Sequence, residues 1–434
     1  MESYIIENTQ SFEKTFRLGL GRAYLHVKEH GDEGLKDIIL RHCLKNPCYD
    51  TQGEASRATW LMSVVDLCTE PSYYTDSIMM ELAKAEDDRD LSQLYDLCLI
   101  MAERGSVQAK DAIYDRFDKQ EFNESWLGGD QIIALDGLSG LTHVARILGQ
   151  RMLDDSEYWD GMTYTHACET FGKEKTNKHL EELAQKYKAV AAYLKNSLES
   201  YKAWERPNDF NTPEKLRERS RHETPFDVIQ SNIENVHKHK SRFLRFGRYA
   251  TNEEIKTLYE RMLNEERPEQ LVRYLWLFRK RELPTLDKKL FDLCCSENED
   301  IYSSAITALS HSTDKRVRDF AIRKISRDKT FPLELIELFT NNYESGDAAY
   351  IERALLQDGN KEKVFSLSYD ILKVFEENPV KEMLKCILWV YENTPCAHCR
   401  CRAVTLLVEH SIMPDHIKNE CRHDCCEEVK ILSA

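Results

Sequence analysis

Apolar residues recur at helical spacing along most of the chain, and no run alternates between apolar and polar residues as a strand would. The clearest case is the segment NEDIYSSAITALSHSTDKRVRDFAIRKISRD, residues 298–328, which predicts two helices joined by a tight turn. The two apolar stripes consist of Ile301, Ala305, Ala308 and Leu309, and of Val317, Phe320, Ala321 and Ile325. Asp314 is placed to cap the second helix.

The same alternation of helix pairs extends to both sides of this segment. First helices are predicted to begin near Pro268, Asn298, Phe331, Lys363 and Pro395, and second helices near Pro284, Asp314, Gly346, Pro379 and Pro414. The period of roughly 30 to 35 residues is typical of stacked helical repeats. In the N-terminal part the pattern is less regular, with second helices predicted after Asp32, Pro71 and Gly105 and an apolar stripe at Leu35, Ile38, Ile39 and Cys43.

The run DKRVRDFAIRKI resembles the second helix of a HEAT repeat, in which a small residue lets paired helices approach and an arginine lies at the turn. The resemblance is strong over residues 250–434 and weaker over 1–150. It implies an all-α fold, a HEAT-like helical-repeat solenoid, and it concerns architecture rather than one functional subfamily.

The period fails in the middle of the chain, where residues 172–249 are highly charged. The first part of this segment, with Leu180, Leu183, Tyr187, Val190 and Leu194, predicts one long amphipathic helix. The second part contains three prolines and is expected to be less ordered. We therefore expect an irregular N-terminal array over 1–171, a charged helical joint over 172–249 and C-terminal repeats over 250–434.

Composition narrows the expected environment and partners. The start of the chain lacks the features of a signal peptide, and no apolar run approaches the roughly 18 residues that span a bilayer, so a cytoplasmic protein without membrane segments is expected. The 14 cysteines are therefore expected to be reduced, mostly as small core residues. The net charge of −15 argues against broad binding to nucleic acid, although a local basic patch stays possible.

The C-terminal cysteines have two interpretations. Cys396 and Cys399, followed about twenty residues later by Cys421 and His423, have the ligand types and approximate spacing of a structural zinc site. The favoured alternative is helix packing without a cofactor, because residues two or three apart in a helix need not converge on one ion.

A basic stretch at 237–248 also has two interpretations. Its cations are interleaved with aromatic residues, as a surface for nucleic acid would require. Alternatively, Phe243 and Phe246 point into the core while the cations face water. Trp204 precedes the proline-bearing part of the joint and is expected to be exposed. The candidate binding residues are Trp204, Lys238, Lys240, Arg242, Arg245 and Arg248.

Common catalytic motifs are missing: there is no phosphate-binding loop, nucleophile elbow or zinc-protease helix, and LGLGRA near residue 18 follows no strand. The chain is thus expected to be a non-enzymatic scaffold that binds a protein partner along a concave solenoid surface. The alternative is a solenoid that binds or modifies nucleic acid through residues 237–248. The HEAT-like DNA glycosylases combine such a basic surface with a helical-repeat fold, so if the chain modifies nucleic acid it is an enzyme. The partner's identity and the oligomeric state are not encoded in any motif.

Overall fold

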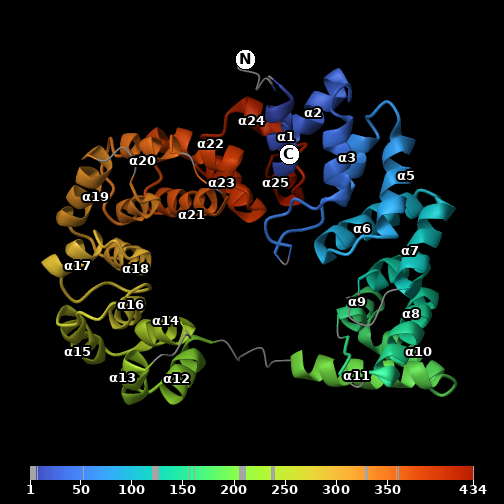
Figure 1. Ribbon diagram of the computed structural model, residues 1–434, viewed down its shortest axis with the longest axis horizontal. Helices are drawn as coiled ribbons and strands as arrows, with labels where there is room; N and C mark the ends of the chain where they lie inside the picture. The colour runs from blue at the N-terminus through green and yellow to red at the C-terminus, as the bar shows by residue number, and fades with distance from the viewer. Residues whose placement is uncertain are drawn as a thin grey trace. The chain divides into compact units, whose positions relative to one another are not determined.

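The computed structural model describes residues 6, 8–51, 53–119, 127–155, 157–160, 162–204, 212–235, 240–327, 331–357, 359 and 361–433, without the side chains of 202–204. Within these residues the chain is all-α and contains no strand, as predicted (Figure 1). It divides into two compact units. Unit 1 comprises residues 1–206 together with 414–434, and unit 2 comprises residues 207–413.

Unit 1 is built from helices of both ends of the chain. Its helices are α1 (Thr9–Leu18), α2 (Gly21–His30), α3 (Lys36–Leu44), α4 (Ala58–Val65), α5 (Pro71–Leu82), α6 (Asp88–Glu103), α7 (Val107–Lys119), α8 (Gly129–Asp154), α9 (Met162–Phe171), α10 (Lys173–Ala184), α11 (Lys188–Trp204), α24 (Asp415–Cys421) and α25 (Glu427–Leu432). The apolar side chains of α1 to α11 form one buried core, and the predicted stripe at Leu35, Ile38, Ile39 and Cys43 lies in it.

The helix α8 is the longest of unit 1 and packs along α11. Gly137, with φ +59°, breaks its regular geometry near the first third. By length and composition α8 could cross a membrane, a possibility that the sequence analysis did not anticipate. This is weak evidence for a membrane segment, because core helices pass the same test. Its residues Leu141, Val144, Ala145 and Leu148 belong to the core of unit 1, and that burial explains its apolar composition.

The C-terminal segment of unit 1 lies against the turn between α1 and α2 (Figure 1). The backbone N–H of Cys425 donates to the carbonyl oxygen of Gly19 at 2.9 Å. A Cβ atom added at Gly21 would overlap the carbonyl oxygen of Glu420, and one added at Gly19 would overlap the Cys425 side chain. The two glycines of LGLGRA therefore allow the N-terminal and C-terminal segments of unit 1 to pack closely. This packing accounts for both glycines without a nucleotide-binding motif.

Side chains reinforce this contact. The indole Nε1 of Trp60 donates to the carbonyl oxygen of His423 at 2.9 Å, and the imidazole of His423 stacks on Tyr24 with ring centroids 5.0 Å apart. Arg22 forms an ion pair with Glu420 at 2.8 Å, and both side chains are nearly buried. The last twenty residues thus pack with the N-terminal helices in unit 1, whereas the sequence analysis placed them in the C-terminal repeats.

Unit 2 contains a regular succession of helices. These are α12 (Pro213–Glu223), α13 (Phe226–Glu234), α14 (Lys240–Tyr249), α15 (Asn252–Leu263), α16 (Pro268–Trp276), α17 (Lys288–Leu293), α18 (Glu299–Ser310), α19 (Lys315–Arg327), the 3-10 helix η1 (Leu333–Phe339), α20 (Ala348–Leu355), α21 (Lys361–Glu377), the 3-10 helix η2 (Lys381–Met383), α22 (Leu384–Asn393) and α23 (Ala397–Glu409). Every helix start predicted between Pro268 and Pro395 lies within about five residues of an observed one.

Packing in unit 2 follows the chain order. The helices α14, α16, α18, η1, α21 and α23 contact one another in succession, while α15, α17, α19, α20 and α22 each pack against a helix of that series. The predicted cap is present, because Asp314 Oδ1 accepts the N–H of Arg316 at 2.8 Å. This neighbour-to-neighbour arrangement is compatible with a helical-repeat solenoid.

Two local predictions need correction. The single helix expected after residue 172 is two helices, α10 and α11, separated by a turn at residues 185–187, and Tyr187 is exposed rather than core-facing. The helix expected near Phe331 is the 3-10 helix η1. In addition, part of the proline-bearing segment forms α12. Pro213 lies in the first turn of this helix, where a backbone N–H would have no intrahelical acceptor, so the proline does not disrupt the helix.

Candidate binding surfaces

The candidate residues of the sequence analysis fall in both units. Trp204 is the last residue of α11 in unit 1, and its side chain lies outside the described part of the structure. Lys238 also lies outside it. The remaining candidates, Lys240, Arg242, Arg245 and Arg248, belong to α14 in unit 2. The structure thus places four cations on one helix of unit 2.

The two faces of α14 differ sharply. Phe243 and Phe246 are buried, at 1% and 5% exposure, which agrees with the interpretation that the aromatic residues point into the core. Arg242 and Arg248 are exposed, and neither has a carboxylate partner among the residues that the structure describes. Arg245 is different, because its guanidinium forms an ion pair with Glu223 of α12 at 2.6 Å. Two of the arginines therefore keep an uncompensated charge.

Backbone contacts fix the position of α14. A Cβ atom at Gly247 would overlap the carbonyl oxygen of Leu277, so α14 lies directly against the end of α16. At its C-terminus, the guanidinium of Arg281 donates to the carbonyl oxygens of Gly247 and Ala250 at 3.0 and 3.2 Å. These bonds satisfy carbonyls that a helix end leaves without partners. Arg281 is thus a structural cap, whereas Arg242 and Arg248 form no hydrogen bond or ion pair with the residues that the structure describes.

Lys240 begins α14 and has a distinct environment. Its ammonium lies 5.6 Å from the centre of the Trp276 ring, within the range of a cation–π contact. Burial, followed by the nearby charge of Arg279, lowers the pKa of Lys240. Lys240 is an exposed residue overall, and its ammonium is partly desolvated where α14 contacts α16.

A pocket of about 350 Å³ adjoins this surface, between α12, α13, α14 and α15. Its lining residues are Ser220, Arg221, Thr224, Pro225, Phe226, Phe246, Tyr249, Ala250, Thr251 and Glu254. The rings of Phe226 and Phe246 lie 6.4 Å apart, and the carboxylate of Glu254 accepts hydrogen bonds from Thr251 within a capping box. The pocket thus combines an aromatic wall with the exposed guanidinium of Arg221.

Phe226 lines this pocket, although no pattern in the sequence predicts it there. Phe226 follows Pro225, which lies at the N-cap of α13, so the pair could be read as a helix start. Its contact with Phe246 joins residues twenty positions apart, and no local pattern reports it.

The four C-terminal zinc candidates are divided between the two units. Cys396 is the N-cap residue of α23 in unit 2 and Cys399 lies in its first turn, and both are buried. The hydrogen bond with Cys396, together with burial, raises the pKa of Cys399. Cys421 and His423 belong to unit 1. No group of three or more His, Cys, Asp or Glu residues in the described part of the chain is arranged to hold a metal ion.

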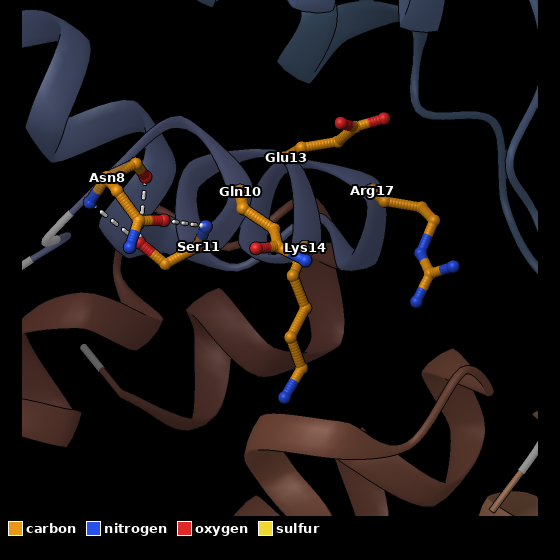
Figure 2. A pocket seen from close by; sticks show the side chains of 6 residues that line it. All are labelled: Asn8, Gln10, Ser11, Glu13, Lys14 and Arg17. Atoms are coloured by element: carbon orange, nitrogen blue, oxygen red, sulfur yellow. Dashed lines mark hydrogen bonds between the residues drawn. The ribbon is translucent and has the colours of Figure 1, made fainter.

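A hollow of about 500 Å³ lies on the surface of α1, and Figure 2 shows the side chains that line it. Its six lining residues, Asn8, Gln10, Ser11, Glu13, Lys14 and Arg17, come from this helix and its cap. Asn8 and Ser11 bond to each other in a capping box, and Glu13 pairs with Arg41 at 2.6 Å. Because one helix supplies all the named walls, the hollow offers little enclosure to a ligand.

No protein-family model matches the chain, and no curated protein matches it significantly. The resemblance to HEAT repeats therefore rests on the repeat pattern and on the helical fold.

Proposed function

We propose that the chain is a HEAT-like helical-repeat scaffold that binds an acidic segment of a protein partner on the α12–α14 surface of unit 2. We define this surface as Arg242 and Arg248 of α14 with the pocket that Arg221, Phe226 and Tyr249 line. The observation that supports the proposal most is that α14 carries two exposed arginines without carboxylate partners among the described residues and also supplies Phe246 and Tyr249 to an aromatic pocket. Arginine and aromatic side chains contribute most to binding energy at protein interfaces.

Charge favours a protein over nucleic acid. A nucleic-acid backbone needs a track of cations, whereas here Glu223 already neutralises Arg245 and the chain as a whole carries a charge of −15. A pocket of about 350 Å³ suits one or two side chains of a peptide. An acidic segment could pair with the arginines and place an apolar side chain against Phe226 and Tyr249.

Charge reversal in cells tests this proposal. The double variant Arg242→Glu with Arg248→Glu should lose one or more proteins that the wild-type chain captures, because like charges then face the acidic segment. The matched control is Lys256→Glu with Lys288→Glu, which makes the same charge change at exposed positions of α15 and α17. A protein lost from the first variant and kept by the control is then purified and its binary affinity measured.

The salt dependence of that affinity identifies the kind of partner. Binding that loses about a thousandfold or more in affinity between 50 and 200 mM salt would indicate phosphate contacts and would favour the nucleic-acid alternative. If the Arg242 and Arg248 variant is folded and captures the same proteins as the wild type, the proposed surface is wrong. Circular dichroism of each variant verifies the fold.

A further inference from the structure

A second pocket, in unit 1, lies where α8 meets the turn between α10 and α11. Its volume is about 520 Å³. Four lining residues come from α8, and four come from the turn and the first residues of α11. They are His143, Arg146, Ile147 and Gln150, followed by Lys186, Tyr187, Lys188 and Ala189.

Close backbone packing builds the pocket. A Cβ atom at Gly149 would overlap the carbonyl oxygen of Ala189, so α8 and the start of α11 touch through their main chains. The turn itself is closed by the N–H groups of Lys186 and Tyr187, which both donate to the carbonyl oxygen of Leu183 at 2.9 Å. The turn therefore holds Lys186, Tyr187 and Lys188 at a fixed place beside α8.

The pocket concentrates positive charge in an acidic chain. None of its lining residues is a carboxylate, and Arg146, Lys186 and Lys188 form no ion pair within the described structure. Arg146 instead lies over the ring of Tyr187, 5.0 Å from its centre, which holds the guanidinium in place. The imidazole of His143 is bonded at 2.7 Å to Asp118, a carboxylate that does not line the pocket.

Helix α11 adds to this positive potential. It has 17 residues and begins at Lys188, so the partial positive charge of its N-terminus lies at the pocket. This effect is supplementary, because the three unpaired cations determine the sign of the site. One guanidinium and two ammonium groups around a single hollow carry more charge than one carboxylate can balance, and they suit the several oxygens of a dianion.

We propose that the pocket formed by Arg146, Lys186 and Lys188 binds a phosphate monoester. The guanidinium supplies paired donors for two phosphate oxygens, and the two lysines compensate the remaining charge. This site is in unit 1 and does not depend on the α12–α14 surface of unit 2. The phosphate can be carried by a small molecule or by a phosphorylated protein side chain, since both present the same group.

Calorimetric titration of the purified full chain at low ionic strength tests the proposal. The probes are inorganic phosphate, a phosphoserine heptapeptide and adenosine monophosphate, with acetate as a carboxylate of lower charge. The three phosphate probes should give saturable binding that acetate lacks. Arg146→Gln should weaken phosphate binding by about tenfold, the usual scale for losing a charge-assisted hydrogen bond. Lys178→Gln, on the exposed side of α10, makes the same charge change outside the pocket and should have no effect.

Comparison among the probes identifies the source of the phosphate. Tighter binding of the peptide assigns the site to a phosphorylated protein, and tighter binding of the nucleotide assigns it to a small molecule. Equal affinities assign it to the phosphate group alone. If Arg146→Gln loses the fold, Lys186→Gln with Lys188→Gln replaces it, because both side chains are exposed. The proposal is overturned if the wild type shows no saturable phosphate binding, if acetate binds equally well, or if the folded pocket variants bind phosphate unchanged.

Discussion

The two units reach their structure through contacts of different range. In unit 2 each helix packs mainly against helices that are close in sequence, and Arg281 meets Gly247 across only 34 positions. In unit 1 the ion pair between Arg22 and Glu420 joins residues 398 positions apart. A local pattern can therefore predict unit 2, whereas unit 1 depends on a contact that no local pattern contains. Substitutions that affect one unit alone can test this difference.

The largest expected effect comes from Gly21→Ala in unit 1. The added methyl group would overlap the carbonyl oxygen of Glu420, so the C-terminal segment must shift, at a cost of about 3 kcal/mol. Hydrogen exchange resolved by peptide should show faster exchange in α1, α2, α24 and α25, with α16 to α21 unchanged. In the counterpart Gly247→Ala the added methyl group would overlap the carbonyl oxygen of Leu277 in unit 2. Exchange should then be faster in the helices of unit 2 and unchanged in α1, α2, α24 and α25. Destabilisation of both units by either change would contradict the division.

The next largest effect concerns Asp130 at the start of α8. Burial raises the pKa of Asp130 to about 6; His166 opposes this shift, and the carboxylates of Asp160, Asp96 and Glu169 add to it. The carboxyl group of Asp130 therefore binds a proton more tightly in the folded state than in the unfolded state. The stabilisation that this proton gives the folded state is present below about pH 4 and is lost as pH rises through about 6. Asp130→Asn should therefore stabilise unit 1 at pH 7.5 by about 2 kcal/mol.

The control for Asp130 has the opposite sign. Hydrogen bonds from Lys110 and Tyr114 overcome the effect of burial and lower the pKa of Asp136. Asp136→Asn should thus destabilise unit 1 at pH 7.5, with a difference from wild type that shrinks as pH falls through the lowered pKa of Asp136. Thermal unfolding of wild type and Asp130→Asn between about pH 4.5 and 8 measures the first trend, and thermal unfolding of wild type and Asp136→Asn extended below about pH 4 measures the second. Equal pH profiles for wild type and Asp130→Asn would show that Asp130 has an ordinary pKa.

A smaller effect is expected for Trp60→Phe. The change removes the hydrogen bond to the carbonyl oxygen of His423 and leaves that acceptor without its donor, at a cost of about 1.5 kcal/mol. Phenylalanine keeps an aromatic ring beside Phe16, whose ring lies 5.0 Å from that of Trp60. Hydrogen exchange should report the loss at residues 420–426. As a control, His423→Ala removes the imidazole that stacks on Tyr24 but keeps the backbone carbonyl that accepts from Trp60. Comparison of the two variants separates the effect of the hydrogen bond from that of the stacking.

The smallest effect belongs to unit 2 and tests its local character. Asn298 accepts the N–H of Ile301 at 3.2 Å and caps α18, so Asn298→Ala should cost about 1 kcal/mol. Faster exchange should be confined to the first turn of α18, because the hydrogen bond of the cap joins residues only three positions apart. Glu297→Ala, at the exposed position before the cap, should leave exchange unchanged. Loss of protection throughout unit 2 would show that its helices unfold as one cooperative body.

The sequence predicts the helices of unit 2 well because their signals are local. Pro268, Asn298 and Asp314 mark observed helix starts through their own backbone restriction or side-chain hydrogen bonds. The turn at 185–187 was missed, because Gln185, Lys186 and Tyr187 are acceptable in a helix. The contact between Gly149 and Ala189, which spans forty residues, accompanies the break.

In the candidate sites, too, the sequence indicates local features but not contacts between separate helices. The arginines of α14 were recognisable as a cluster, and the burial of Phe243 agrees with the interpretation based on helical spacing. The pairing of Arg245 with Glu223 and the contact of Phe226 with Phe246 were not predictable, because they join separate helices. In the unit 1 pocket, Arg146 lies forty residues before Lys186, and each is an ordinary surface cation by sequence alone.

The division of unit 1 between two distant segments has a consequence for biosynthesis. The ribosome makes residues 1–206 first, and residues 414–434 follow only after the intervening unit 2, roughly 10 to 40 seconds later at ordinary elongation rates. During that interval the surface of α1 and α2 that receives Glu420 and His423 has no partner, and the indole of Trp60 lacks its acceptor. Unit 2, with its short-range contacts, can fold before the C-terminal segment packs against the N-terminal helices. During this interval a chaperone can bind the exposed surface of α1 and α2 before residues 414–434 are made.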